Sequence, residues 1–142
     1  MMQDEPQRKV AEVMHLGVIT CRPDASLRTV AGIFAEHRIH AVVVEGRDPD
    51  APGPCTVVTD RDIVLRHSRG ELDRVTARDA AGEPAVTVRP DTDLRKASEL
   101  MAHYGTSHVI VTEAGGSRPV GVLSSLDVAA AIASPDEPPK HE

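Results

Sequence analysis

Two short segments of the chain place a hydroxyl three residues ahead of a carboxylate. Thr59 precedes Asp62, and Ser124 precedes Asp127. Because each hydroxyl follows an apolar strand and opens a helix, it should lie beside free backbone N–H groups at the positive end of the helix dipole, which suits a phosphate. The carboxylate can accept hydrogen bonds from two vicinal hydroxyls, such as those of a ribose. Each segment is therefore a candidate nucleotide clamp.

The same pattern is also typical of a capping box, in which the hydroxyl caps the helix and the carboxylate returns to the N–H of the capping residue. Such a cap stabilises a protein by about 0.5–2 kcal/mol and is commoner than a ligand site. Both roles can coexist, because the carboxylate can leave its cap when a ribose arrives.

The two segments differ in charge. Arg61 adjoins Asp62, and Arg38 and His40 lie just before the preceding apolar run. The matching places of the second segment hold Leu126 and Thr106-Ser107-His108. Because cations form charge-assisted bonds with phosphate, we hypothesise that the Thr59/Asp62 site prefers a more highly phosphorylated ligand. Alternatively, Arg61 forms a weak ion pair with a surface carboxylate.

Both segments belong to an internal duplication in which residues 18–63 recur as 85–128. Pro23 recurs as Pro90, an offset of 67, which falls to 65 at Ser124 because the second loop is shorter. Two copies of this length predict two similar structural units. Since about 60 residues are only marginally stable alone, we expect the copies to pack face to face around a pseudo-two-fold axis.

Each copy predicts an α/β (α+β) fold with the order β-α-β-β-α, preceded by a short helix. The apolar spacing is helical after Pro23 and Pro90, with Ser26 or Asp24 and Asp93 or Asp91 as caps. Short β-branched runs indicate buried strands. The expected strands are 18–20, 41–44 and 56–58, then 85–88, 109–111 and 120–123; the expected helices are 10–15, 27–34 and from 59, then 76–81, 94–104 and from 124.

Composition narrows the functional class. The 142 residues carry 22 acidic and 16 basic side chains, a net charge of −6, which argues against a nucleic-acid duplex as partner. Phe34 and Tyr104 are the only aromatic residues, so stacking platforms for single strands are lacking. Neither a membrane span nor a signal peptide is predicted, and we expect a cytoplasmic protein. The segments 1–9 and 134–142 are predicted to be disordered.

The histidines and cysteines show no local metal motif. A zinc site would have to assemble from distant residues such as Cys21, Cys55 and His40, and free thiols are expected in a reducing compartment. Serines and histidines are scattered without a nucleophile elbow or cofactor motif. We therefore expect no catalytic residues, no metal and no required cofactor, and hence no enzyme.

The duplicated pattern resembles a tandem pair of cystathionine β-synthase (CBS) domains, the Bateman module. The resemblance rests on Pro23-Asp24 and Pro90-Asp91, on the buried strands, and on two hydrophobic-hydrophobic-Thr/Ser-x-x-Asp signatures within 57–63 and 122–128. The string from Thr59 to Val64 further resembles small bacterial proteins that consist of a CBS pair alone. The boundaries would be 10–69 for the first repeat and 70–133 for the second.

The resemblance implies an adenosyl ligand, AMP, ADP, ATP or S-adenosylmethionine, in clefts between the repeats. Strand backbone near Thr20 and Thr87 would then contact the base. Two departures bear on the first site: Thr56 replaces the second copy's Gly121, which could hinder a ligand's approach, and Arg38 replaces Gly105, where a left-handed helix cap favours glycine. The candidate ligand-binding residues are Thr20, Cys21, His40, Ala41, Thr59, Arg61, Asp62, Thr87, Val88, Ser107, His108, Ser124 and Asp127.

Three functional hypotheses follow. The first is a regulatory module that binds an adenosyl ligand and signals through contacts with a second copy or an unknown protein partner. The second is a ligand-free dimeric interaction protein with vestigial clefts. The third is a redox or zinc sensor that uses Cys21 and Cys55. Homodimerisation is expected in the first two, since the helices after the signatures carry aliphatic residues that a second chain could cover.

Overall fold

The computed structural model describes residues 8–46, 56–81, 84–113, 118–136 and 138–139, and it forms two compact units. The first-copy unit is Val18–Ala85. The second-copy unit combines Met1–Gly17 with Val86–Glu142. The short helix that precedes each repeat in the sequence therefore packs with the other repeat: helix α1, Val10–Val13, belongs to the second-copy unit, and α4, Ala77–Ala81, belongs to the first-copy unit.

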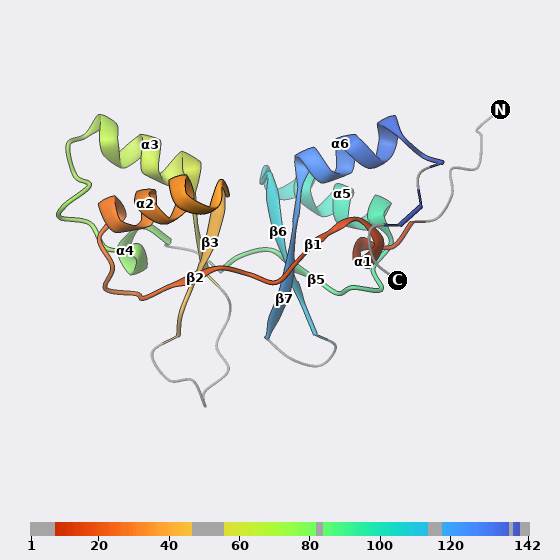
Figure 1. The fold of residues 1–142 in the computed structure, drawn as a ribbon, viewed down its shortest axis with the longest axis horizontal. Helices are drawn as coiled ribbons and strands as arrows, with labels where there is room; N and C mark the ends of the chain where they lie inside the picture. Colours follow the sequence, from red (N-terminus) through yellow and green to blue (C-terminus); the bar gives the residue numbers. More distant parts are fainter. Residues whose placement is uncertain (1–7, 47–55, 82–83, 114–117, 137, 140–142) are drawn as a thin grey trace. The chain divides into compact units, whose positions relative to one another are not determined.

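The first-copy unit is built around a three-stranded sheet with the order β2-β3-β4. Strands β2 and β3 are parallel and are joined by α2, as parallel neighbours require a crossover. Strand β4 returns antiparallel to β3 and leads directly into α3, which lies beside α2 (Figure 1). The bounds are β2 Thr20–Cys21, α2 Leu27–His37, β3 Ala41–Val44, β4 Thr56–Thr59 and α3 Asp60–Ser68.

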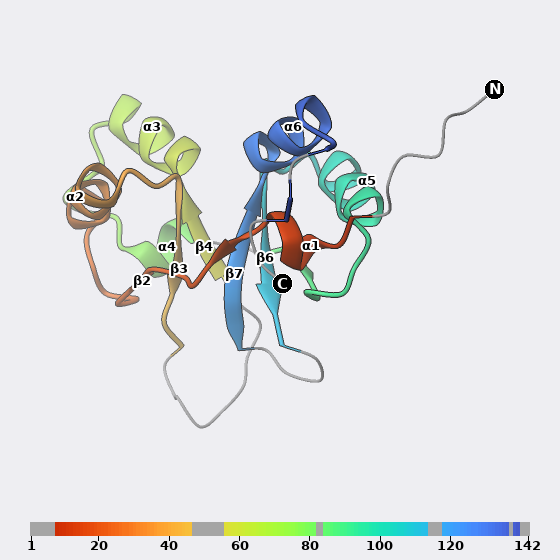
Figure 2. The same cartoon turned by 45° about the vertical axis from the view of Figure 1, so that its right-hand side comes forward.

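The second-copy unit repeats this plan with a fourth strand. Its sheet has the order β1-β7-β6-β5, in which β5 and β6 are parallel and joined by α5. Helices α5 and α6 lie side by side, and α1 packs in the same unit (Figure 2). The bounds are β1 His15–Leu16, β5 Thr87–Val88, α5 Leu94–Tyr104, β6 His108–Thr112, β7 Pro119–Ser124 and α6 Ser125–Ala133.

Each unit has its own aliphatic core. In the first-copy unit, Leu27 and Val30 from α2 pack against Val42 and Val58 from the sheet, and all four are at most 1% exposed. In the second-copy unit the inner face of α1 joins the sheet residues and α5. The members of this second core are Val10, Val13, Met14, Val88, Ala97, Met101, Val109, Val111, Leu123 and Ala131. Burial of these side chains is the main force that holds each repeat's helices on its sheet.

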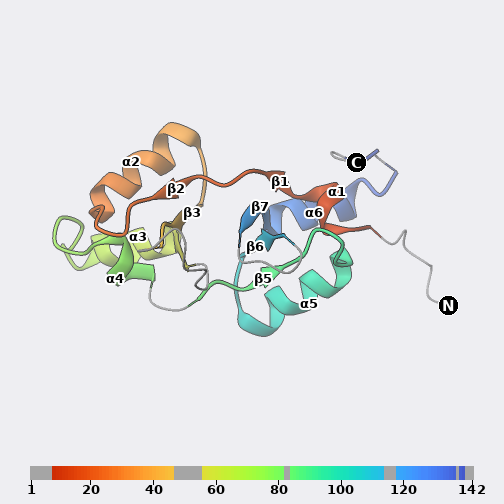
Figure 3. The same ribbon diagram turned by 90° about the horizontal axis from the view of Figure 1, so that it is seen from below.

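Strand β1 is the element that the sequence analysis did not predict. It lies beside β7 (Figure 3) and pairs with it antiparallel, with His15 opposite Val122 and Leu16 opposite Gly121. A Cβ at Gly121 would lie 2.5 Å from the carbonyl oxygen of His15, so only glycine admits this strand. In the first-copy unit, the corresponding pairing among the described residues is an isolated bridge between Thr56 and Pro84, and proline has no N–H to extend a ladder. The close approach of β1 therefore explains why residue 121 is a glycine.

The helix ends match their predicted chemistry in part. Ser26 caps α2 by accepting from the Thr29 N–H at 3.1 Å. Asp93 stands at the N-cap of α5, but its carboxylate is bonded to Lys9 Nζ at 2.6 Å and makes no cap bond. Gly105 ends α5 in the left-handed backbone conformation that was predicted for it.

The predicted mixed α+β fold with two β-α-β-β-α copies is confirmed. Of the segments predicted to be disordered, residues 1–7, 137 and 140–142 lie outside the described residues, whereas Arg8 Nη2 donates to the Pro135 carbonyl at 2.6 Å. The connections expected from the sequence between the second and third strands of each copy, residues 46–54 and 114–119, also lie mostly outside them. The longest helices of the described ranges, α2 and α5, have 11 residues each, and none could cross a bilayer.

Candidate functional site

In the first-copy unit, Thr59 and Asp62 form a capping box at the start of α3. Asp62 Oδ2 accepts hydrogen bonds from the Thr59 N–H at 2.8 Å and from the Thr59 hydroxyl at 3.1 Å. Within the described part of the chain, no donor contacts the other carboxylate oxygen, Oδ1. Because Asp62 is only half-buried, this oxygen is open to a further donor.

In the second-copy unit, Ser124 and Asp127 form the same capping box at the start of α6. Asp127 Oδ2 accepts from the Ser124 N–H at 2.8 Å and from the Ser124 hydroxyl at 3.0 Å. Its Oδ1, however, lies 2.8 Å from Nε2 of His15, and Asp127 is only 5% exposed. His15 was not among the site residues predicted from the sequence, because a two-residue strand leaves no periodic signal.

The sheet register brings several predicted residues to the same end of each sheet. Ala41, the first residue of β3, is opposite Thr59, as His108 is opposite Ser124. The residue before each strand also binds the first residue of the helix: the Asp60 N–H donates to the His40 carbonyl at 2.9 Å, and the Ser125 N–H donates to the Ser107 carbonyl at 2.8 Å. The strand start and the clamp therefore form one local arrangement in each copy.

The residues predicted to contact a base lie on a different strand from the clamp. Thr20 and Cys21 are on β2, which is separated from β4 by β3, and Thr20 is opposite Val43. The Thr20 hydroxyl donates to a carboxylate oxygen of Glu45 at 3.1 Å. In the second copy, Thr87 and Val88 occupy the equivalent strand, with the Val88 side chain buried. Two strand spacings, roughly 10 Å, separate these residues from the clamp.

Burial of Cys21 decides its chemistry. Desolvation, together with a smaller contribution from the nearby Glu45 carboxylate, raises the pKa of its thiol to about 11. The thiolate is the reactive and metal-binding form of cysteine. Because the raised pKa keeps the Cys21 thiol protonated at neutral pH, its redox reactivity and zinc affinity are low. Cys55, the other predicted member, lies outside the described residues. Over those same ranges, no three His, Cys, Asp or Glu side chains converge on a common point.

The basic side chains near the first-copy clamp, Arg61 and His40, differ in their contacts. Arg61 is exposed, and no ion pair of its guanidinium occurs among the described residues, so the alternative of a surface salt bridge finds no partner there. His40 Nδ1, by contrast, lies 3.3 Å from a carboxylate oxygen of Asp60, a residue that the sequence analysis did not select. In the second copy, Ser107 Oγ and His108 Nδ1 are 3.0 Å apart. Leu126 stands there at the place that Arg61 holds in the first copy.

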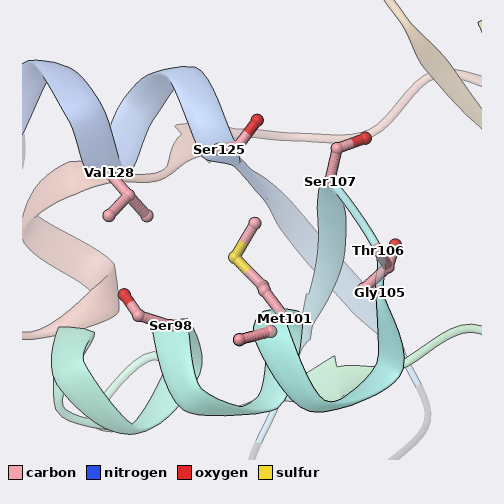
Figure 4. Close-up of a pocket in the computed structure, with 8 residues that line it drawn as sticks. Ser98, Met101, Gly105, Thr106, Ser107, Ser125 and Val128 are labelled. Carbon is pink, nitrogen blue, oxygen red and sulfur yellow. The ribbon is translucent and has the colours of Figure 1, made fainter.

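Each unit also has a pocket between two of its helices, and the two pockets are equivalent under the repeat. The pocket between α5 and α6 has a volume of about 390 Å³, and its counterpart between α2 and α3 has about 460 Å³. In the former, Met101 and Val128 point toward the space between the helices (Figure 4). Of the predicted site residues, the pockets include only Ser107 and His40. They are therefore distinct from the carboxylate clamps.

Comparison with known proteins places this pattern in a family. The model of the CBS domain matches the chain twice, at residues 10–68 and 77–134. An uncharacterized protein of Methanopyrus kandleri is 30% identical over 121 residues, which cover 84% of this chain and 60% of that protein. The chain thus spans less than two thirds of the length of the curated relatives that it matches.

Solved structures support the same fold. A CBS domain protein from Pyrobaculum aerophilum complexed with AMP has a TM-score of 0.72 and 28% identity, with 84% of this chain and 89% of that chain covered. A CBS domain pair in complex with 5′-methylthioadenosine and S-adenosyl-L-methionine has a TM-score of 0.77 at 19% identity, with 91% and 98% covered. The second likeness supports the fold alone.

Proposed function

Because this chain belongs to the CBS domain family and contains two copies of that domain, we propose that it is a regulatory module that binds an adenosyl ligand. The candidate ligands are AMP, ADP, ATP and S-adenosylmethionine. The observation that carries the proposal is the duplicated clamp, in which a hydroxyl and a carboxylate stand at the N-terminus of a helix in each unit. The AMP bound by the relative from Pyrobaculum aerophilum supports the ligand class.

The clamp fits the two ends of a nucleotide. The positive end of the helix dipole at the start of α3 favours a phosphate, and Arg61 adds an exposed cation beside it. Asp62 Oδ1 can accept from ribose hydroxyls while Oδ2 keeps its cap bonds to Thr59. Thr20, on the far strand, would contact the base. The function is binding rather than catalysis, since the sequence contains no nucleophile elbow or cofactor motif.

Regulation further requires that the ligand favour one of two states of an assembly, because only differential binding can shift an equilibrium. We infer that the assembly contains a second copy of this chain. In each unit the helix after the clamp exposes aliphatic side chains: Val64 is 68% and Leu126 is 73% exposed. Sedimentation with and without AMP tests this step. A dimer whose stability does not change with ligand would favour the alternative of an assembly protein with vestigial sites.

The proposed ligand is tested by a thermal-shift titration with AMP, ADP, ATP and S-adenosylmethionine. A ligand specific for the folded state adds about 2.7 kcal/mol at a hundredfold excess over its Kd. The test variant is Asp62→Ala. Its matched control is Asp79→Ala, which removes another capping box, the Thr76/Asp79 box of α4, with bonds of 3.4 and 3.3 Å.

Both variants lose a helix cap, so both should be somewhat less stable than the wild type. Only Asp62→Ala should also lose the ligand-induced shift. If none of the four ligands shifts the wild-type midpoint, the proposed function is wrong. If both variants keep the full shift, Asp62 is a helix cap alone.

A further inference from the structure

The two clamp carboxylates differ in one contact that the duplication does not explain. Asp127 Oδ1 lies 2.8 Å from His15 Nε2, a distance at which an imidazole N–H donates to a carboxylate. Across the described ranges, Asp62 Oδ1 has no such neighbour. Asp127 is also the more deeply buried of the two, at 5% exposed against half-buried for Asp62. The two otherwise identical clamps therefore differ in how much of the carboxylate a ligand can use.

His15 reaches Asp127 because β1 is fixed against β7. Leu16 lies opposite Gly121, and the Gly17 N–H donates to the Val120 carbonyl at 2.7 Å. The position of His15 is thus set by the backbone rather than by its contact with Asp127. In the first copy, Pro84 bridges Thr56 as Leu16 pairs with Gly121, so the residue that corresponds to His15 in the sequence is Glu83, whose ionised carboxylate is not a hydrogen-bond donor. Among the residues that the structure describes, a histidine contact to the clamp carboxylate is therefore found in the second copy alone.

A count of acceptor sites shows what this contact does. An ionised carboxylate offers about four lone pairs, two on each oxygen. In both clamps the cap residue directs two donors to Oδ2. Asp62 then retains two free acceptor sites on Oδ1, as a vicinal diol requires. Asp127 retains at most one, because His15 occupies the other.

We propose that His15 determines which clamp accepts a ribose: it closes the Asp127 clamp to vicinal diols and leaves the Asp62 clamp as the adenosyl site. The inference rests on the proposed function and adds an occupancy of one ligand per chain. His15 acts as a specificity-determining residue through Asp127. Displacing the imidazole would convert the chain from one diol site to two.

The experiment is isothermal titration of the full chain with AMP, and its readout is the number of AMP molecules bound per chain. The wild type should bind one equivalent and His15→Ala should bind two. The double variant His15→Ala/Asp127→Asn should return to one. His15→Gln, whose amide can donate to the same oxygen, should restore the single event. His15 is 66% exposed, so these substitutions should leave the fold intact, which circular dichroism checks.

A matched control is His103→Ala, which removes another exposed histidine of the same unit and should bind one equivalent. A parallel titration uses 2′-deoxy-AMP, which lacks the diol. The His15→Ala variant should bind this ligand at least about tenfold more weakly than AMP, a loss of about 1.4 kcal/mol.

Two equivalents bound by the wild type, or one equivalent bound by both wild type and His15→Ala, would overturn the role of His15 while the proposed function stands. Absence of AMP binding by every folded variant, His15→Ala included, would instead overturn the proposed function, and the role of His15 with it. One equivalent that becomes two only when the imidazole is removed supports both.

Discussion

Arg38 and Gly105 end equivalent helices of the two repeats with nearly the same left-handed backbone, at φ of 54° and 61°. Arg38 is the only non-glycine residue with positive φ in the described ranges. A side chain in this conformation costs about 1–2 kcal/mol. Replacing the side chain by glycine would remove this cost. Glycine also increases the entropy of the unfolded chain, however, which offsets about 0.4–1 kcal/mol of the stabilisation.

The substitution Arg38→Gly should therefore stabilise the protein by roughly 0.5–1 kcal/mol. The reciprocal change, Gly105→Ala, should destabilise it by about 1 kcal/mol, because alanine must adopt the strained conformation. Urea unfolding measures both. If Arg38→Gly lowers the midpoint, contacts of the arginine side chain outweigh the backbone strain.

Gly121→Ala should destabilise the second-copy unit by about 1–3 kcal/mol, the usual cost of overpacking. The added Cβ would lie 2.5 Å from the His15 carbonyl oxygen and 3.0 Å from the Met14 sulfur. Gly32→Ala is the matched control: Gly32 lies within α2, where an added Cβ meets no atom within 4 Å. It should stabilise by roughly 0.5–1 kcal/mol, since alanine favours a helix. Equal effects of the two substitutions would contradict the close approach of β1.

Asp127→Ala should cost more stability than Asp62→Ala. Both variants lose a capping box, which is worth about 0.5–2 kcal/mol. Asp127 is also buried and contacts His15, so its removal leaves the Ser124 N–H and the imidazole without their acceptor. We expect about 1 kcal/mol for Asp62→Ala and at least about 2 kcal/mol for Asp127→Ala. Chemical unfolding of both variants tests the order, and the reverse order would show that the His15 contact adds no stability.

Cys21 should make stability decrease at high pH. Burial, with a further contribution from Glu45, raises the pKa of its thiol from 9.0 to about 11. A raised folded-state pKa means that the folded protein holds this proton more tightly than the unfolded chain. Its contribution is therefore fully present below pH 9 and is lost as the pH rises to about 11.

The free energy of unfolding should fall by about 2 kcal/mol across that window from this group. Unfolding of the wild type and of Cys21→Ala at several pH values isolates the term, because the variant lacks the titrating thiol. A pH dependence that is the same in both proteins would show that Cys21 makes no such contribution.

Arg61 should give the first-copy site a preference for ligands with more phosphates. Its guanidinium is exposed beside the N-terminus of α3, where Leu126 occupies the matching place in the second copy. Arg61→Leu should lower the affinity for ATP relative to AMP by about two- to fivefold, the effect of one solvent-exposed charge pair worth up to about 1 kcal/mol. Arg66→Leu, which removes a cation already paired with Glu71 at 2.9 Å, is the control. An unchanged ATP/AMP ratio in Arg61→Leu would reject the preference.

Much of the fold could be predicted from the sequence because the signals are local and appear twice. The apolar helix spacing around Leu27 and Leu94, the β-branched runs, and the two hydroxyl-carboxylate pairs each specify an element and its start. The capping boxes formed where the spacing indicated. Gly105 predicted a left-handed helix end in the same way.

The features that were not predicted from the sequence depend on contacts between distant segments. His15 meets Asp127 only because residues before the first repeat join the second, a pairing that no periodicity records. Gly121 was interpreted as room for a ligand, although it is the place where β1 approaches. Asp60, which contacts His40, was overlooked because an acidic residue in a first helical turn is ordinary.

The exchange of the leading helices also sets an order of events at the ribosome. Val18–Ala85 is one continuous stretch, whereas its companion unit needs residues from both sides of it. At about 5–20 residues per second, roughly 3–14 s of translation separate the two parts of that companion. During this interval Val10, Val13 and Met14, all destined for its core, have no partner surface to cover them. The α1 segment is thus made before the first repeat but reaches its place only after the second, and mutations that slow synthesis of the second repeat would lengthen its exposure to chaperones and proteases.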